Sequence, residues 1–469
     1  MSIKNNRLGL TFAYLSLVFF NSFVDLGHKI LIQNIFYITE PPHLFTIYSA
    51  IVNSMILIPY LLMFSPSGFI ADRFAKSSVL KITAWAALPL TCLITYFYYL
   101  GLFWPAFIMT LLLATQSAIN SPAKYGYVKE YFKSDALARA NGYVQALTVA
   151  AILLGTFLFS LFFQNLLGPL NLNINKSKIM QTIAPLGFLL IAGSLFESIM
   201  SLFLPKFKAV AQESRFEFKK YFTGTYVREN LKEIGHNRTV LYCILGLSIF
   251  WGINQVVLAC YGAYLKEHVL GATPVYVQGA MGIAVIGVIL GSLYFGKISK
   301  QFIEIGTVPV AVFATAISLW LMVSLTNKIG ILFLFLFYGF FSGLLLVPLN
   351  SLIQFYAPQN KLGKILAANN FLQTLFMFGF LILTVFLTLL DINAFWVFRI
   401  LFVFSLIIFL ITIKMLPQSM IRFILYFFVS KFYKLKIHGL NNLPASGGVL
   451  LLGNHTSYLD WAAIQMASP

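Results

Sequence analysis

The sequence predicts an all-α membrane protein that crosses the bilayer many times. Hydrophobic residues make up 59% of its 469 residues and charged residues only 10%, whereas soluble domains average about 25% charged residues. Apolar runs recur along almost the whole chain, and each reaches the roughly 18–20 residues that a helix needs to span a membrane. The net charge of +18 does not imply nucleic acid as a partner, because Lys and Arg also gather on cytoplasmic loops and near anionic lipids.

We expect twelve membrane spans in two six-helix bundles, which together form a transporter-like unit over residues 1–416. A polar central loop at 205–238 separates an N-terminal bundle at 8–204 from a C-terminal bundle at 239–416. The predicted spans are 8–36, 44–70, 79–100, 103–120, 137–164, 180–204, 239–265, 274–296, 306–326, 329–355, 363–390 and 393–416.

The basic residues predict the orientation. With both termini in the cytoplasm, most of the 32 Lys and Arg residues fall in cytoplasmic loops and tails, as the positive-inside rule requires. The exceptions are Lys176, Lys178, Lys266 and Lys328 in external loops, and Lys29 and Arg399 inside spans.

The two halves resemble a diverged repeat. Residues 141–145 open the fifth span, residues 369–373 hold the corresponding place in the eleventh, and each group follows a proline, Pro122 or Pro348, by about twenty residues. Paired interruptions in corresponding spans are typical of transporters built from repeats. Chance agreement among common residue types is the alternative.

The loop between the second and third spans reads GFIADRFAK and begins at Gly68. It resembles the signature loop of the major facilitator superfamily, which implies a gate at the cytoplasmic side. In that reading Gly68 allows close helix approach, and Asp72 and Arg73 hold one conformation by charge pairing. An ordinary basic cytoplasmic loop is the alternative.

More specific segments resemble the lysophospholipid transporter family within that superfamily, over residues 8 to about 416. They are NSPAKYG from Asn120, RANG from Arg139, AAILLG from Ala150, IFWG from Ile249 and VPLNSLIQ from Val347. The resemblance implies a protein of the bacterial inner membrane that moves lysophospholipids, mainly ethanolamine and glycerol forms, towards the cytoplasm for reacylation.

Ionisable residues inside spans are costly, so they are expected to face a cavity or a partner. Asp25 lies deep in the first span, and Lys29, four residues on, shares its face. The family resemblance assigns Lys124 to the lipid phosphate and Asp25 to the ammonium headgroup or a coupling cation. An ion pair of Asp25 with Lys29, and an anchoring role for Lys124 at the cytoplasmic end, remain open.

Two charges of the family pattern are absent. Gln145 stands where the family has Glu, and Leu258 where it has Arg, which puts cation coupling and headgroup preference in doubt. Glu197 and Arg399 are candidate substitutes, although Arg399 also suits snorkelling to the interface. Further polar side chains are candidates for a substrate path, or for contacts between helices: Asn141, Gln145, Asn254, Gln255, Asn350, Asn369 and Gln373.

The amino-acid composition of the chain changes after residue 416. Residues 417–438 mix apolar and basic side chains, which predicts a linker helix in the membrane interface, with a plain linker as the alternative. Residues 439–469 contain NLPASGGVL followed by an NHx4D box, and resemble the start of a glycerophospholipid acyltransferase. That resemblance implies His455 as general base and Asp460 as the residue that orients it. Since the downstream phosphate-binding motif is missing, residues 439–469 are not expected to catalyse alone.

We therefore expect a lysophospholipid transporter that works by alternating access and is fused to an acyltransferase. The expected partners are lysophospholipid, membrane lipids, a possible coupling cation and the acyl donor, and the protein is expected to be monomeric. Neither a metal site nor a cofactor is expected, because the three cysteines lie in apolar runs without ligand spacing. An acyltransferase that uses its spans only as an anchor, and a drug or metabolite facilitator, are the alternatives.

Overall fold

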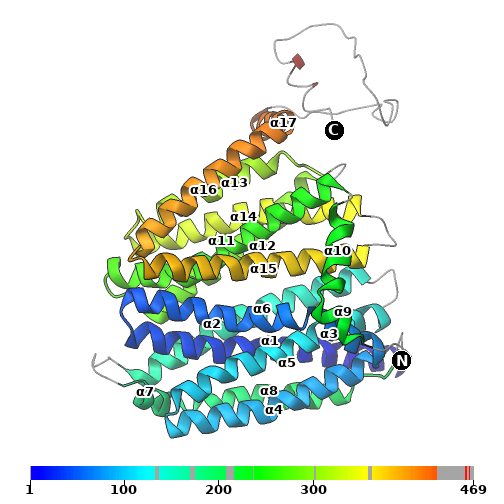
Figure 1. The fold of residues 1–469 in the computed structure, drawn as a ribbon, viewed down its shortest axis with the longest axis vertical. Coiled ribbons are helices and arrows are strands. Elements are labelled where there is room, and N and C mark those ends of the chain that lie inside the picture. Colours follow the sequence, from blue (N-terminus) through cyan, green and yellow to red (C-terminus); the bar gives the residue numbers. More distant parts are fainter. Residues whose placement is uncertain are drawn as a thin grey trace.

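The computed structural model describes residues 2–131, 137–168, 175–207, 216–235, 237–299, 303–357 and 362–429, together with the isolated positions 432, 460, 461 and 464. All regular secondary structure in this part is helical, which confirms the predicted all-α class. Figure 1 shows two layers of roughly parallel helices, the first formed by α1–α8 and the second by α11–α16.

The first bundle contains eight helices because two of the predicted spans are each divided in two. Its helices are α1 (Ser2–Thr39), α2 (Pro42–Leu62), α3 (Phe64–Arg73), α4 (Lys76–Leu100), α5 (Phe103–Tyr131), α6 (Leu137–Leu167), α7 (Lys176–Ile183) and α8 (Leu186–Leu202).

Two short helices connect the bundles, and a last helix follows the second bundle. The connecting helices are α9 (Phe218–Phe222) and α10 (Thr225–Gly235). The second bundle and its extension are α11 (Arg238–His268), α12 (Pro274–Ile298), α13 (Thr307–Met322), α14 (Lys328–Tyr356), α15 (Leu362–Leu389), α16 (Ala394–Met415) and α17 (Pro417–Val429).

Ten helices in the described part are long and apolar enough to cross a membrane. The pair α7 and α8, bent by 53°, counts as an eleventh if it forms one span. The remaining predicted span, 306–326, coincides with α13, which has only 16 residues. The chain is therefore a multi-span membrane protein, and the count of twelve remains a prediction.

The two faces of the molecule differ in how the bundles meet. We call the face that carries the start of α1 together with α3, α9 and α10 the terminal face, and the face that carries α7 the opposite face (Figure 1). In the half near the opposite face, one hydrophobic core runs through both bundles, from Phe45 of α2 to Tyr264 of α11. In the half near the terminal face, each bundle has a separate core. The bundles are therefore joined most firmly at the opposite face.

Polar contacts reinforce this junction. The Lys266 ammonium of α11 donates hydrogen bonds to the backbone carbonyls of Tyr37 and Glu40 at the α1–α2 turn. The Tyr37 hydroxyl donates to the carbonyl of Ala272 at 2.9 Å. These hydrogen bonds tie the end of α1 to the end of α11. They must therefore break before the two bundles can part at the opposite face.

Glycines make α12 and α14 the most closely packed helix pair of the second bundle. A Cβ atom on Gly287 or Gly291 of α12 would lie 2.3 or 2.0 Å from a carbonyl oxygen of α14. Conversely, one on Gly339 or Gly343 would lie 1.8 or 2.5 Å from a carbonyl oxygen of α12. Both helices thus carry the small-xxx-small pattern by which membrane helices approach closely.

The last helix, α17, is fixed to the second bundle by a buried ion pair. Arg422 Nη2 of α17 lies 2.9 Å from Glu304 Oε1 just before α13, and both residues are almost fully buried. The same carboxylate accepts a hydrogen bond from the backbone N–H of Gly306. Gly306 in turn contacts the backbone of Ser419, where a Cβ would not fit. The sequence predicted a helix here but not its attachment to α13.

We predict opposite effects for two Gly→Ala substitutions in this bundle. Gly339→Ala forces the backbones of α12 and α14 apart and is expected to cost about 1–3 kcal/mol, as in other overpacked cores. Gly279→Ala, on α12, has nothing within 4 Å of its new Cβ and should be neutral or stabilising by up to ~1 kcal/mol. Thermal unfolding in detergent measures both, and equal effects would contradict the packing described.

Candidate functional site

A cavity of about 170 Å³ lies inside the first bundle, between α1, α2, α5 and α6. Asn21, Asp25 and His28 line it from α1, and their spacing of four and three residues places them on one helix face. His28 is fully buried and hydrogen-bonded through both ring nitrogens, to the Tyr98 hydroxyl and the carbonyl of Ala106. It is therefore part of the wall rather than a free binding group.

The opposite wall of this cavity is polar because of the sequence of α5. Ser117, Asn120 and Lys124 face the cavity at intervals of three and four residues. Pro122 lies inside the helix between them, and a proline there leaves a backbone carbonyl of the preceding turn without its helical partner. Asp25 and Lys124, which were predicted as separate site residues, are thus brought to one cavity from two helices.

A third charged residue, Glu197 of α8, lies behind the cavity wall and interacts with the lining residues Asn21 and Lys124. The Ser117 hydroxyl donates a hydrogen bond to Asp25, and Lys124 interacts electrostatically with both Asp25 and Glu197. Asn21, which lines the cavity, donates to Glu197 Oε1 at 3.2 Å. Glu197 is only 1% exposed, and its second oxygen has no hydrogen-bond partner.

This charge cluster, Asp25, Lys124 and Glu197, contains two carboxyl groups and one amino group. If all three are ionised, it carries one excess negative charge in a buried setting, which is unfavourable unless a further positive group compensates it. A proton, a cation or a cationic headgroup could do so. Within the described ranges, no group of three or more His, Cys, Asp or Glu side chains is arranged to hold a metal ion.

The other charged candidate of α1, Lys29, does not line the cavity. No ion pair joins it to Asp25 in the described part of the chain, although the two residues are four positions apart. Asn141 and Gln145 lie in α6, but the structure describes their backbone only. The roles predicted for these three residues therefore remain predictions.

Arg399 of α16 lies near the opposite face and not beside the charge cluster. Its guanidinium donates to the carbonyl of Trp320 and the hydroxyl of Ser324, and lies 4.8–5.1 Å from the ring centroids of Phe395 and Trp320. These contacts agree with the snorkelling interpretation. Of the two candidate substitute charges, only Glu197 lies near the cavity, where it accepts a hydrogen bond from the lining residue Asn21.

The amide candidates of the second bundle are held mainly by their own helices. Asn254 and Asn350 donate to the carbonyls four residues earlier, and Gln373 donates to Asn369 Oδ1 at 2.8 Å. The Tyr338 hydroxyl adds a contact to Asn254 between α14 and α11. None of them lines the cavity at Asp25, and their role in a substrate path remains a prediction.

The predicted gate residues lie at the terminal face, at the end of α3. Asp72 and Arg73 are exposed. No ion pair with Asp72 is formed by any residue in the described segments, and Arg73 contacts the rings of Phe69 and Phe74. A Cβ on Gly68 would meet nothing within 4 Å, so Gly68 makes no close helix contact in this conformation.

The ion pair found beside this loop was not predicted. Lys76 Nζ, at the start of α4, lies 2.5 Å from Glu130 Oε1 at the end of α5, and Lys76 is 7% exposed. Gly126 leaves room for the Lys76 chain, since a Cβ there would lie 2.4 Å from Lys76 Cε. The sequence feature that could have indicated this close contact was Gly126, two residues after Lys124.

The acyltransferase-like box falls mostly outside the described residues. His455 lies outside them, and Asp460 is described only as an isolated helical position. The structure therefore supplies no geometry for this pair.

The family model of the Major Facilitator Superfamily matches residues 12–380. Among curated proteins, the lysophospholipid transporter LplT of Photorhabdus laumondii is 27% identical over 324 residues, covering 65% of this chain and 70% of that protein. The protein of the same name from Klebsiella pneumoniae is 24% identical over 311 residues, with the same coverage.

Solved structures agree in fold. A bacterial homologue of the human lysosomal transporter Spinster, in an inward-facing and unoccupied conformation, superposes with a TM-score of 0.59 at 14% identity and covers 80% of each chain. The nucleoside transporter NupG gives a TM-score of 0.62 at 11% identity over 86% of this chain and 99% of that one. At such identities the likeness concerns the fold alone.

We predict that the charge cluster is energetically coupled. Lys124→Met leaves two buried carboxyl groups without their cation and is expected to destabilise the protein by about 3 kcal/mol or more. Adding Glu197→Gln removes one of these charges, so the double variant should recover about 1–2 kcal/mol of that loss. Thermal unfolding of the purified variants in detergent measures the coupling, and purely additive effects would contradict the cluster.

Proposed function

Because the chain belongs to the major facilitator superfamily and is a membrane transporter, we propose that it moves lysophospholipids across the bacterial inner membrane by alternating access. The observation that carries this proposal is the charge cluster in the first bundle. Lys124 offers a cation for the lipid phosphate, while Asp25 and Glu197 offer the excess negative charge that an ammonium headgroup would compensate.

The curated relatives point to the same substrate class. Both curated relatives described above are lysophospholipid transporters, and Asp25 and Lys124 lie within residues 12–380, which the superfamily model matches. The cavity is small, about 170 Å³, which suits a headgroup better than a whole lipid. The acyl chain would then extend away from it along the apolar walls of the bundle.

The direction of transport follows from the orientation that the basic residues favour. We place the terminal face in the cytoplasm, because most Lys and Arg residues outside the spans belong to that side. In this orientation the firmly joined face is periplasmic. Lysophospholipid would enter when the Lys266 contacts to Tyr37 and Glu40 separate, and leave towards the cytoplasm when they re-form.

We further propose that a fused acyltransferase reacylates the delivered lipid, with His455 as base and Asp460 as its orienting residue. In the protein as it is expressed in its host, His455→Ala should abolish acylation of labelled lysophospholipid and leave its uptake unchanged. Loss of both activities would instead indicate that the box belongs to the transport unit.

We predict that neutralising the charge cluster stops transport. Uptake of radiolabelled lysophosphatidylethanolamine would be measured in cells that lack their own lysophospholipid transporter. Asp25→Asn and Lys124→Gln are each expected to lower the initial rate at least tenfold, because each removes one charge partner of the headgroup.

Matched controls separate this effect from a general charge effect. Asp391→Asn, in an exposed turn, and Lys81→Gln, on the exposed side of α4, make the same chemical changes away from the cavity. They should retain at least half of the rate. Normal uptake by correctly folded Asp25→Asn and Lys124→Gln proteins would refute the proposed function.

A further inference from the structure

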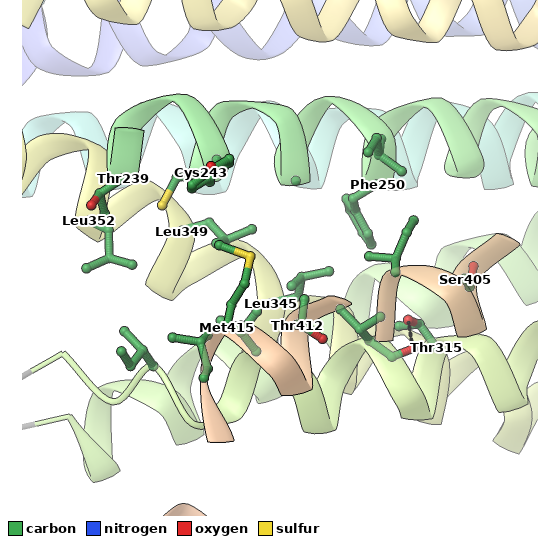
Figure 2. Close-up of a pocket in the computed structure, with 18 of the residues that line it drawn as sticks. Thr239, Cys243, Phe250, Thr315, Leu345, Leu349, Leu352, Ser405, Thr412 and Met415 are labelled. Atoms are coloured by element: carbon green, nitrogen blue, oxygen red, sulfur yellow. Dashed lines mark hydrogen bonds between the residues drawn. The ribbon is translucent and has the colours of Figure 1, made fainter. Parts of the chain in front are cut away.

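A second, larger cavity of about 360 Å³ lies within the second bundle, between α11, α13, α14 and α16. Figure 2 shows its lining, with Thr239 and Leu352 towards one end and Phe250, Thr315 and Ser405 towards the other. The residues that line it all belong to the second bundle or to the turns beside it. It is therefore separate from the cavity that contains Asp25.

The walls of this cavity are mainly apolar, and two of their hydroxyl groups are already hydrogen-bonded within their own helices. Most lining residues are aliphatic or aromatic. The Thr315 and Thr412 hydroxyls donate to carbonyls of their own helices, those of Val312 and Phe409, at 2.9 and 2.8 Å. A buried water needs about two to four polar partners, and a polar ligand would lose its hydrogen bonds here. The cavity therefore suits a hydrocarbon occupant.

Exposure shows which end of the cavity is open. Tyr242, Tyr356 and Met415, at the terminal-face ends of α11, α14 and α16, are 46–50% exposed. At the other end, Phe250, Thr315 and Ser405 are buried. An occupant would therefore enter from the terminal face and reach into the middle of the bundle.

The dimensions suit one hydrocarbon chain. Residues 239–253 of α11 line the cavity, a distance of roughly 21 Å along a helix. If a methylene group takes about the volume of a water molecule, ~30 Å³, then 360 Å³ holds about twelve methylene groups. The length and the volume of the cavity together suit one extended acyl chain.

Positive charges lie beside the open end. Arg238 and Lys414 are both exposed and are the chain neighbours of the lining residues Thr239 and Met415. Cations at the edge of an apolar cavity attract the phosphate of a lipid whose tail lies inside. The ion pair of Glu304 with Arg422 fixes α17 beside Ile305 and so holds this end of the cavity in place.

We propose that this cavity holds the acyl chain of a single-tailed phospholipid, with its phosphate beside Arg238 and Lys414. The identification of the lipid as a lysophospholipid rests on the proposed function. The site lies at the face towards which that function delivers its substrate. It is thus a second lipid site, distinct from the headgroup site at Asp25, where the lipid is retained after it crosses the membrane.

Photolabelling tests this proposal directly. The purified full chain, in nanodiscs, is irradiated with a lysophosphatidylethanolamine that carries a diazirine near the end of its acyl chain, and labelled peptides are mapped by mass spectrometry. Labels are expected at the closed end, around Phe250, Thr315 and Ser405. Excess unlabelled lysophosphatidylethanolamine should compete, and a diacyl phospholipid should not.

Substitutions that fill the cavity, compared with the same substitution outside it, test whether the label depends on the cavity itself. Thr315→Phe should lower labelling of the cavity at least fivefold, whereas Thr374→Phe, the same change on α15 outside the cavity, should leave it unchanged. Gly246→Val is the second filling variant, because its new Cβ meets only Leu349, at 3.3 Å. Both filling variants are compared only after thermal unfolding shows that they fold.

The possible outcomes separate this site from the proposed transport function. Asp25→Asn should stop uptake without reducing labelling of the cavity. Labels confined to the outer surface, or unaffected by both filling variants, would overturn the proposal even if transport is normal. Equal competition by diacyl phospholipid would overturn the single-chain assignment.

Discussion

The buried cluster of three ionisable groups in the first bundle is the constraint on which the rest of this structure depends. Asp25, Glu197 and Lys124 are withdrawn from water and supported by few hydrogen bonds. Such groups persist in a membrane protein only where they face a partner or a cavity. The cluster therefore has a cost in stability that a bound headgroup can offset, and this links the energetics of the fold to substrate recognition.

The rest of the molecule forms two helix bundles, and the proposed function requires these bundles to move against each other. The glycine-mediated contact of α12 with α14 makes the second bundle stiff, because backbones in direct contact leave no side chains to rearrange. The bundles share one core near the opposite face and have separate cores near the terminal face. In the alternating-access mechanism that we propose, rocking about such a junction would change access to the cluster without unfolding either bundle.

Sequence alone predicted the helical, multi-span class and singled out Asp25 and Lys124 as substrate-binding candidates, but not that the two line one cavity inside the first bundle. These features follow from hydropathy, from the cost of buried charge and from motifs at fixed helical spacing. Three features could not be predicted, namely the junction of Glu197 with Asn21, the ion pair of Lys76 with Glu130, and the attachment of Arg422 to Glu304. Each joins residues far apart in the chain, and no local pattern specifies which helices become neighbours.

The most direct test of the central claim is an experimental structure of the protein with bound lysophosphatidylethanolamine. This account predicts the lipid phosphate within hydrogen-bonding distance of Lys124, and the ammonium group beside Asp25 with Glu197 behind it. A headgroup bound elsewhere, with the cavity between α1 and α5 empty or filled by apolar side chains, would contradict it.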